Sequence, residues 1–142
     1  MRVLADTSVI IPALVRAHVH HAAASPYLDR AARGEARLLV SAHATAEAFA
    51  TLTVMQPQLT PAVALRLLDE GLLAFAEVVS LDADDYRVVL ARMASLGLAS
   101  GAVYDGLHVR AAEKAEANEL VTLNGRDFRR MPPAPPCRLV VL

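Results

Sequence analysis

Cysteine and aromatic residues are scarce in this sequence. The 142 residues include one cysteine, Cys137, and no tryptophan, and aromatic residues amount to 4% of the chain. One cysteine cannot form an internal disulfide, so nothing in the sequence requires an oxidising compartment, and we expect a partly buried thiol. The low aromatic content argues against extensive stacking of single-stranded RNA bases on the protein.

Long apolar runs and an excess of charge of one sign are also absent. A transmembrane helix needs about 20 consecutive apolar residues, and the apolar runs at 9–15 and 72–76 are far shorter. Asp6 interrupts the apolar region that a signal peptide would need, so we expect a cytoplasmic protein with no membrane association. The 15 acidic and 14 basic side chains give a formal net charge of -1. Binding to nucleic acid would therefore require local clustering of charge, because bulk electrostatic attraction is missing.

Hydrophobic residues make up 55% of the chain, which is enough for one sizeable core and too much for a disordered protein. We expect a single domain over residues 1–142, in which short apolar segments alternate with longer segments of helical period. Strands are expected at residues 2–5, 38–40, 77–80, 120–123 and 138–142. Helices are expected at residues 9–15, 21–33, 42–55, 83–96 and 103–117, with a further helix beginning at 61.

This alternation predicts βαβ units and a mostly parallel sheet with helices on both faces. Ligands bind such sheets beyond the carboxyl ends of the strands. We therefore expect function around Asp6, around Ser41 and after Thr122, which is where the unusual acids lie.

Four acids are harder to explain than the others, most of which fall on polar helix faces or near helix ends. Asp6 follows an apolar strand, and its ordinary interpretation is a helix N-cap. Glu47 lies in an Ala-rich helix with almost no other charge, where a solvated Glu is the ordinary alternative. Asp105 opens a helix, where it can offset the helix dipole. Asp127 lies in a loop beyond a strand, where acids often stabilise turns.

The joint pattern of these acids indicates a metal site. A doubly covered sheet would bring all four to one edge, where carboxylates repel one another unless a cation neutralises them. Carboxylate clusters without His or Cys suit Mg²⁺ or Mn²⁺ rather than zinc. Such ions support the hydrolysis of phosphodiesters.

Four blocks of sequence carry a family resemblance: LADTS at 4–8, SAHATAE at 41–47, GAVYDGLHVRAA at 101–112 and LVTLNGRDF at 120–128. In order and spacing they resemble the PIN domain, and most closely the VapC-type toxin ribonucleases of bacterial toxin–antitoxin pairs. The chain departs from the pattern at Ala102, where many relatives have a second glycine, and at Asn124, where some carry an acid. The second departure makes Asp127 the remaining candidate for the fourth acid.

The resemblance implies a three-layer α/β/α sandwich and a divalent metal, Mg²⁺ or Mn²⁺. Asp6, Glu47 and Asp105 would be ligands, directly or through water, and Asp127 would act behind them or on a second metal. Thr7 or Ser8 would assist by hydrogen bonding. The implied reaction is hydrolysis of an RNA phosphodiester that leaves a 5′-phosphate and a 3′-hydroxyl.

The resemblance also implies a cognate antitoxin and a homodimer. The apolar side of residues 49–55 and the segment 65–73 serve the core in the simplest interpretation, and in the family such helices form the dimer and a groove for an antitoxin helix. A catalytically silent RNA-binding or scaffold protein is the alternative function. A phosphoacceptor receiver domain would need paired acids after the first strand and a lysine after a late strand, and the sequence has neither.

Two sets of basic residues stay open on the sequence alone. Arg126, Arg129 and Arg130, with Arg138 further on, either contact RNA phosphates or form a solvated loop. The histidines His18, His20 and His21 are a candidate zinc or nickel site, but a solvated helix entry is the simpler interpretation because no ordered second ligand pair accompanies them. For His43 and His108 we expect packing on a helix face rather than contact with substrate or antitoxin.

Overall fold

The computed structural model describes residues 1–142 and contains one five-stranded sheet in the order β3-β2-β1-β4-β5. All neighbouring strands run parallel. The strands are β1 (Arg2–Ala5), β2 (Arg37–Ser41), β3 (Ala76–Val79), β4 (Glu119–Thr122) and β5 (Arg138–Val141). Each lies within one or two residues of a strand expected from the sequence. The predicted mostly parallel sheet is confirmed and is fully parallel.

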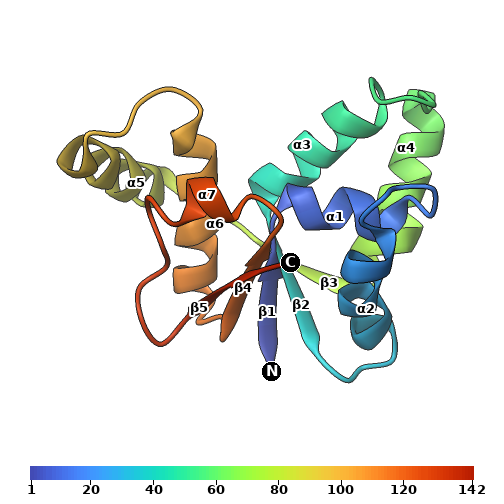
Figure 1. Ribbon diagram of the computed structural model, residues 1–142, viewed down its shortest axis with the longest axis horizontal. Helices are drawn as coiled ribbons and strands as arrows, with labels where there is room; N and C mark the ends of the chain where they lie inside the picture. Colours follow the sequence, from blue (N-terminus) through green and yellow to red (C-terminus); the bar gives the residue numbers. More distant parts are fainter.

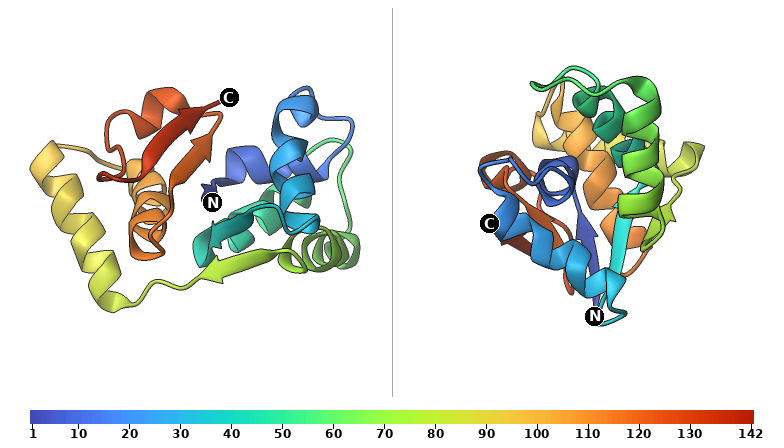
Figure 2. Two further views of the ribbon diagram at one scale, coloured as in Figure 1. Left: turned by 90° about the horizontal axis from the view of Figure 1, so that it is seen from below. Right: turned by 90° about the vertical axis from the view of Figure 1, so that its right-hand side faces the viewer.

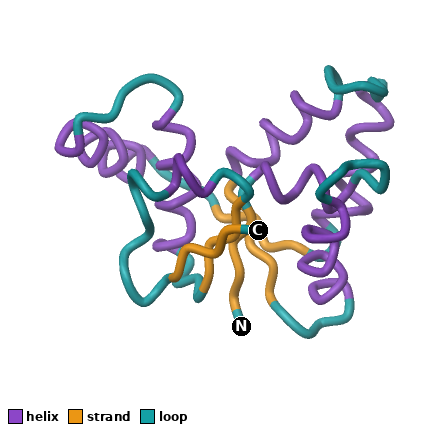
Figure 3. Tube along the Cα trace, in the orientation of Figure 1, coloured by secondary structure: helices purple, strands orange, loops and turns teal.

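Helices cover both faces of this sheet and complete three layers (Figure 1). One group contains α1 (Thr7–Leu14), α2 (His21–Ala32), α3 (Ala42–Leu52), α4 (Pro61–Leu68) and the π-helical turn η1 (Asp69–Leu73). The other contains α5 (Ala83–Leu96), α6 (Ala102–Lys114) and α7 (Gly125–Phe128). The two groups lie on opposite sides of the strands in the left view of Figure 2 and in Figure 3.

The alternation of strand side chains divides the core into two halves. On β1, Val3 and Ala5 pack with α1, α3 and β2 in one buried cluster, whereas Leu4 packs with α6 and α7 residues in a second cluster. Leu4 lies opposite Leu39 of β2 and Leu120 of β4, and all three are fully buried. Both faces of the central strands are therefore apolar, as a doubly covered parallel sheet requires.

Helix starts follow the capping residues that the sequence offers. Ser41 accepts a hydrogen bond from the backbone N–H of Ala44 at the start of α3. Thr60 caps α4, which has proline in its first turn. Asp82 and Asp85 form a reciprocal capping box at the start of α5. These caps satisfy backbone N–H groups that the first turn leaves unpaired.

The one element that the sequence interpretation missed is α7. Asp127 was expected in a loop, but the chain from Gly125 to Phe128 forms a single helical turn. Phe128 is fully buried against the second core cluster and anchors this turn. A Cβ at Gly125 would come within 2.7 Å of the Val141 side chain, so glycine allows α7 to begin close against β5. Tertiary packing, rather than a local periodicity, creates this helix.

None of the helices is long and apolar enough to cross a membrane. Several apolar side chains near and on α3 and α4 remain exposed nonetheless: Phe49 is 37% exposed, Val54 71%, Val63 47% and Leu65 53%. Leu52 and Leu68 of the same helices are buried in the core. The expectation of core burial therefore holds for one side of these helices only.

Candidate active site

The connections of the sheet change direction at β1, which leads to β2 on one side and has β4 on the other. Ligand sites of parallel α/β sheets lie at such a switch point, beyond the carboxyl ends of the strands. Asp6 immediately follows β1, and Thr122 is the last residue of β4. The hydroxyl of Thr122 donates a 2.9 Å hydrogen bond to Asp6 Oδ2 across this point.

Asp6 occupies the N-cap position of α1, but its side chain makes no capping hydrogen bond. Its other oxygen, Oδ1, accepts a 2.7 Å bond from Ser8 Oγ, which in turn accepts from the backbone N–H of Leu123 at 2.9 Å. The carboxylate is 3% exposed. Burial raises the pKa of Asp6, although the bonds from Ser8 and Thr122 act in the opposite direction. Ser8 and Thr122 therefore fix the Asp6 side chain, which does not act as the helix N-cap that was its ordinary interpretation from the sequence.

Glu47 projects from α3, accepts hydrogen bonds from two side chains and lies near the imidazole of a third. Thr7 Oγ1 donates to Glu47 Oε2 at 2.6 Å, and His108 Nε2 lies 2.9 Å from the same oxygen. His43 Nε2 lies 3.2 Å from Oε1. Partial burial raises the pKa of Glu47, but the bonds from His108 and Thr7 and the attraction to both imidazoles outweigh it and lower the pKa to about 2. Glu47 is therefore a firmly ionised carboxylate.

His108, on α6, connects Glu47 to the end of β2. It is 2% exposed, and its Nδ1 lies 3.0 Å from Ser41 Oγ. Because Ser41 Oγ already accepts from Ala44, its own proton is available to Nδ1, which places the proton of a neutral ring on Nε2, facing Glu47. The expectation of helix packing for His108 is correct but incomplete. Its place three residues after Asp105 was the only sequence signal for this connection.

Asp105 lies in the first turn of α6 and differs from the other two acids in its support. Its side chain accepts no hydrogen bond within the chain, and it is partly buried. Burial raises the pKa of Asp105 to about 6; His108 opposes this shift, and the charges of Asp127, Asp6 and Glu47 add to it. The other three carboxylates are thus close enough to Asp105 to oppose its ionisation, and their joint role as a site stays a prediction.

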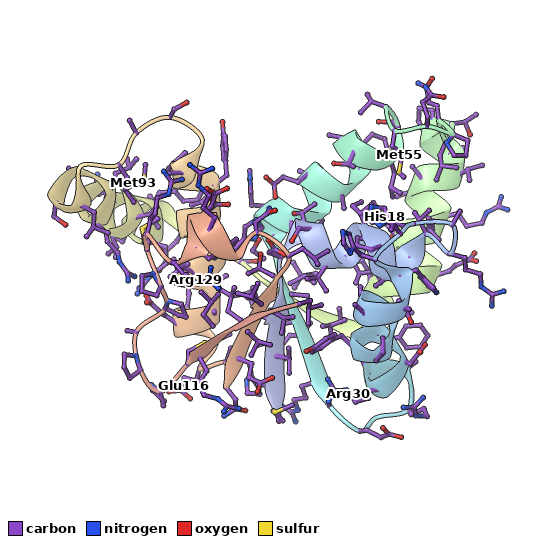
Figure 4. The ribbon with its side chains drawn as sticks, viewed as in Figure 1. His18, Arg30, Met55, Met93, Glu116 and Arg129 are labelled. Atoms are coloured by element: carbon purple, nitrogen blue, oxygen red, sulfur yellow. The ribbon has the colours of Figure 1, made fainter.

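The fourth acid, Asp127, is half exposed on α7 and pairs with Arg130 at 3.3 Å. Arg126 and Arg129 are exposed on or next to the same turn. Figure 4 shows Arg129 beside α7. The short helix therefore carries an acid and one arginine on its exposed surface, and two more arginines follow it directly.

A family model described as the PIN domain matches residues 3–132, which include all four acids. The chain belongs to the PIN domain family. A similar curated relative is Ribonuclease VapC27 of Mycobacterium tuberculosis, which is 40% identical over 123 residues, or 85% of this chain and 83% of the relative.

Solved structures of similar fold include VapC20 of Mycobacterium tuberculosis, described as a Sarcin-Ricin loop cleaving toxin. It has a TM-score of 0.71 and 14% identity, over 91% of this chain and 95% of that one. VapBC2 from Rickettsia felis, bound to a DNA fragment from its promoter, has a TM-score of 0.70 and 19% identity, over 100% and 99%. At these identities the two structures establish that this PIN domain shares their fold.

The donor set of this PIN domain suits a hard divalent cation. Asp6, Glu47, Asp105 and Asp127 offer carboxylate oxygens only, as Mg²⁺ and Mn²⁺ prefer. No three His, Cys, Asp or Glu side chains are arranged as a ready-made metal-binding group. The oxygens of Asp6 and Glu47 instead face hydroxyl and imidazole donors, and the charges of the other acids act on Asp105. A cation would offset both the burial and the carboxylate repulsion that raise the pKa of Asp105.

Proposed function

We propose that this PIN domain is a metal-dependent endoribonuclease that hydrolyses RNA phosphodiester bonds and acts as the toxin of a toxin–antitoxin pair. The observation that carries the proposal is the placement of Asp6 and Glu47 at the switch point, where hydroxyl and imidazole groups hold both carboxylates. The 40% identity to a mycobacterial protein named as a ribonuclease supports the choice of RNA as substrate. RNA and an antitoxin would both be met in the cytoplasm.

Asp6, Glu47 and Asp105 would hold Mg²⁺ or Mn²⁺, with Asp127 behind them or at a second ion. When bound, such an ion supplies an activated water and stabilises negative charge on the phosphoryl oxygens. The chain supplies orientation: Ser8 and Thr122 fix both oxygens of Asp6, and Thr7 and His108 fix one oxygen of Glu47.

Asn124 lies two residues beyond β4 at the same edge, where its side-chain amide has no partner within the chain. The exposed Arg126 and Arg129, together with Arg130, would hold phosphates of the RNA next to the acids. Phosphate contacts of this kind position a nucleic acid without reading its sequence.

We further propose a homodimer and an antitoxin partner that use the apolar surface of α3 and α4. The exposed apolar set consists of Phe49 on α3, Val54 just beyond it, and Val63 and Leu65 on α4. Scattered exposed apolar side chains are common, but several on adjacent helices fit a docked helix. The described fold neighbour VapBC2 is a complex bound to promoter DNA, which supports an antitoxin that also binds DNA.

The proposal is tested by RNA cleavage with Mg²⁺ or Mn²⁺, comparing the wild-type protein with Asp6→Asn and Asp105→Asn. Asp29→Asn is a matched control, because Asp29 is exposed on α2 and remote in sequence from all four acids. We expect both site variants to lose at least about a hundredfold in rate and the control to retain wild-type activity. Equal cleavage by all four proteins would refute the role of the acids. RNA binding without cleavage by the wild type would favour the catalytically silent alternative.

A further inference from the structure

A second feature of this sheet edge is a pocket of about 550 Å³ next to the acids. Thr7 and Ser8 of α1 and Asn124 after β4 line one side of it, and His18 and His20 from the segment between α1 and α2 line another. Its volume falls within the roughly 300–1,000 Å³ typical of small-molecule sites. Figure 4 shows His18 beyond the end of α1, on the opposite side of the sheet edge from Arg129.

Two residues that line the pocket also hydrogen-bond to the acids. Thr7 donates to Glu47, and Ser8 donates to Asp6, so the two hydroxyl-bearing residues face the pocket and hold the carboxylates at once. A group bound in the pocket is therefore separated from the carboxylates by a single layer of side chains. That separation suits the nucleotide adjoining a phosphate that lies at the acids.

The histidines of the pocket have unused polar atoms. The backbone N–H of His20 donates to His18 Nδ1 at 3.2 Å, which leaves Nε2 of His18 as the protonated nitrogen of a neutral ring. His18 Nε2 and both ring nitrogens of His20 have no partner within the chain. His21 differs, because its Nδ1 lies 2.7 Å from the carbonyl of Pro12 and ties the start of α2 to α1.

The arrangement of the rings fits a flat ligand rather than a metal. The centroids of the His18 and His20 rings lie 5.7 Å apart at an interplanar angle of 38°. With His21 engaged by the backbone, no three ligating side chains converge there. Ile11 and Leu123 add apolar surface to the same pocket. Aromatic faces, apolar surface and free donors together match a base with its ribose and phosphate.

We propose that this pocket binds one unpaired nucleotide of the RNA, next to the phosphate that is cleaved, through His18 and His20. The inference rests on the proposed ribonuclease function. It assigns a role to two histidines for which the sequence alone left two interpretations open, a metal site and a solvated helix entry. It is also compatible with the low aromatic content, because one stacked nucleotide needs only one or two rings.

The test separates RNA binding from cleavage. We would measure the affinity of a fluorescein-labelled, mixed-sequence single-stranded RNA of about twelve nucleotides by anisotropy, in an Asp105→Asn background that slows cleavage. His18→Ala/His20→Ala in this background is compared with Arg16→Ala, which removes a full charge from the same segment at an exposed position outside the pocket. We expect the double variant to weaken binding about tenfold and the Arg16 variant to stay within about twofold of the background.

Cleavage by otherwise wild-type protein gives the second measurement. We expect His18→Ala/His20→Ala to raise KM about tenfold, with kcat and the Mn²⁺-induced rise in Tm unchanged. Unchanged RNA affinity in the double variant would overturn the nucleotide pocket, as would an equal loss in the Arg16 variant. If the double variant lost the antitoxin complex but kept its RNA affinity, the pocket would belong to the protein partner and the nucleotide proposal would again be overturned. If the wild type binds RNA through these histidines but never cleaves it, the pocket stands and the ribonuclease proposal fails.

Discussion

The connection from Ser41 through His108 to Glu47 makes a sharp prediction, because each end of the imidazole can be replaced separately. In His108→Gln the side-chain amide reaches the position of Nε2 and can still donate to Glu47. In His108→Asn the shorter amide reaches only the position of Nδ1, beside Ser41. The pair therefore asks whether Glu47 depends on the specific donor that the structure places 2.9 Å from its Oε2.

The magnitude follows from the burial of His108 and its bonds. His108 is 2% exposed and its ring lies 6.4 Å, centroid to centroid, from that of the buried Phe128. Losing the bond to an ionised carboxylate costs about 1.5–3 kcal/mol, and the reduced packing adds about 1 kcal/mol. We therefore expect His108→Asn to lower the free energy of unfolding by about 3 kcal/mol and His108→Gln by about 1 kcal/mol.

The site gives the more specific outcome. Residues that orient a metal ligand typically contribute about 10–100-fold in metal affinity. We expect His108→Asn to weaken Mn²⁺ binding by about tenfold and His108→Gln by no more than about threefold. Urea unfolding without metal gives the stability, and calorimetric titration of the folded proteins with Mn²⁺ gives the affinity. Wild-type Mn²⁺ affinity in His108→Asn would refute the reasoning, because Glu47 would then be positioned without His108.

Three further predictions concern the contacts between α5 and α6 and the arginines near α7. Lys114 lowers the pKa of Asp85 through a hydrogen bond that outweighs the effect of burial. Ionised Asp85 therefore stabilises the fold above its unfolded pKa of about 3.9. This stabilisation is lost as the pH falls through the lower pKa of the folded state. Asp85→Asn should cost about 2 kcal/mol at pH 7, and urea unfolding at pH 7 and pH 3 should show the difference from wild type shrinking in acid; a constant difference would contradict this account. A Cβ at Gly106 would lie 2.7 Å from side-chain atoms of Val89 and Met131, so Gly106→Ala should lower the free energy of unfolding by about 1–2 kcal/mol despite its better helix propensity, and an increased Tm would show that the packing relaxes freely. Arg126→Ala/Arg129→Ala should reduce the slope of log K for RNA against log salt by about 1.4, or about 0.7 for each phosphate contact, and an unchanged slope would place the RNA elsewhere.

The alternation of apolar and helical segments was enough to predict the sheet and its helices, because each strand of a doubly covered parallel sheet is apolar on both faces. Leu4 and Val3 illustrate this, since one packs toward α6 and the other toward α1. The sequence singles out Asp6, Glu47 and Asp105 by their positions after a strand, in a nearly uncharged helix and at a helix start, and their role as site residues stays a prediction. Capping residues such as Ser41 and Asp82 also marked helix starts correctly.

Other features depend on contacts between distant segments and leave no local pattern. The helical turn α7 forms because Phe128 enters the core, so Asp127 is carried on a helix and not in the expected loop. The bond between His108 and Glu47 joins residues 61 positions apart. His18 and Asn124 meet at one pocket although they lie in different thirds of the chain. Such pairings are determined by the tertiary fold alone.

The different support of the three inner acids also explains why the near-zero net charge of the chain says little about its function. Asp6 and Glu47 have their negative charge stabilised by hydroxyl and imidazole donors within the protein. Asp105 has no such donor, and it faces the other carboxylates across a partly buried site. Attraction to His108 favours its ionised form, but burial and the charges of the other three acids oppose it, so a bound cation would stabilise that form further. Since two acids are already fixed at the same edge, that cation would find a set of oxygen ligands, and RNA would then bind to an acidic site through the metal and the nearby arginines.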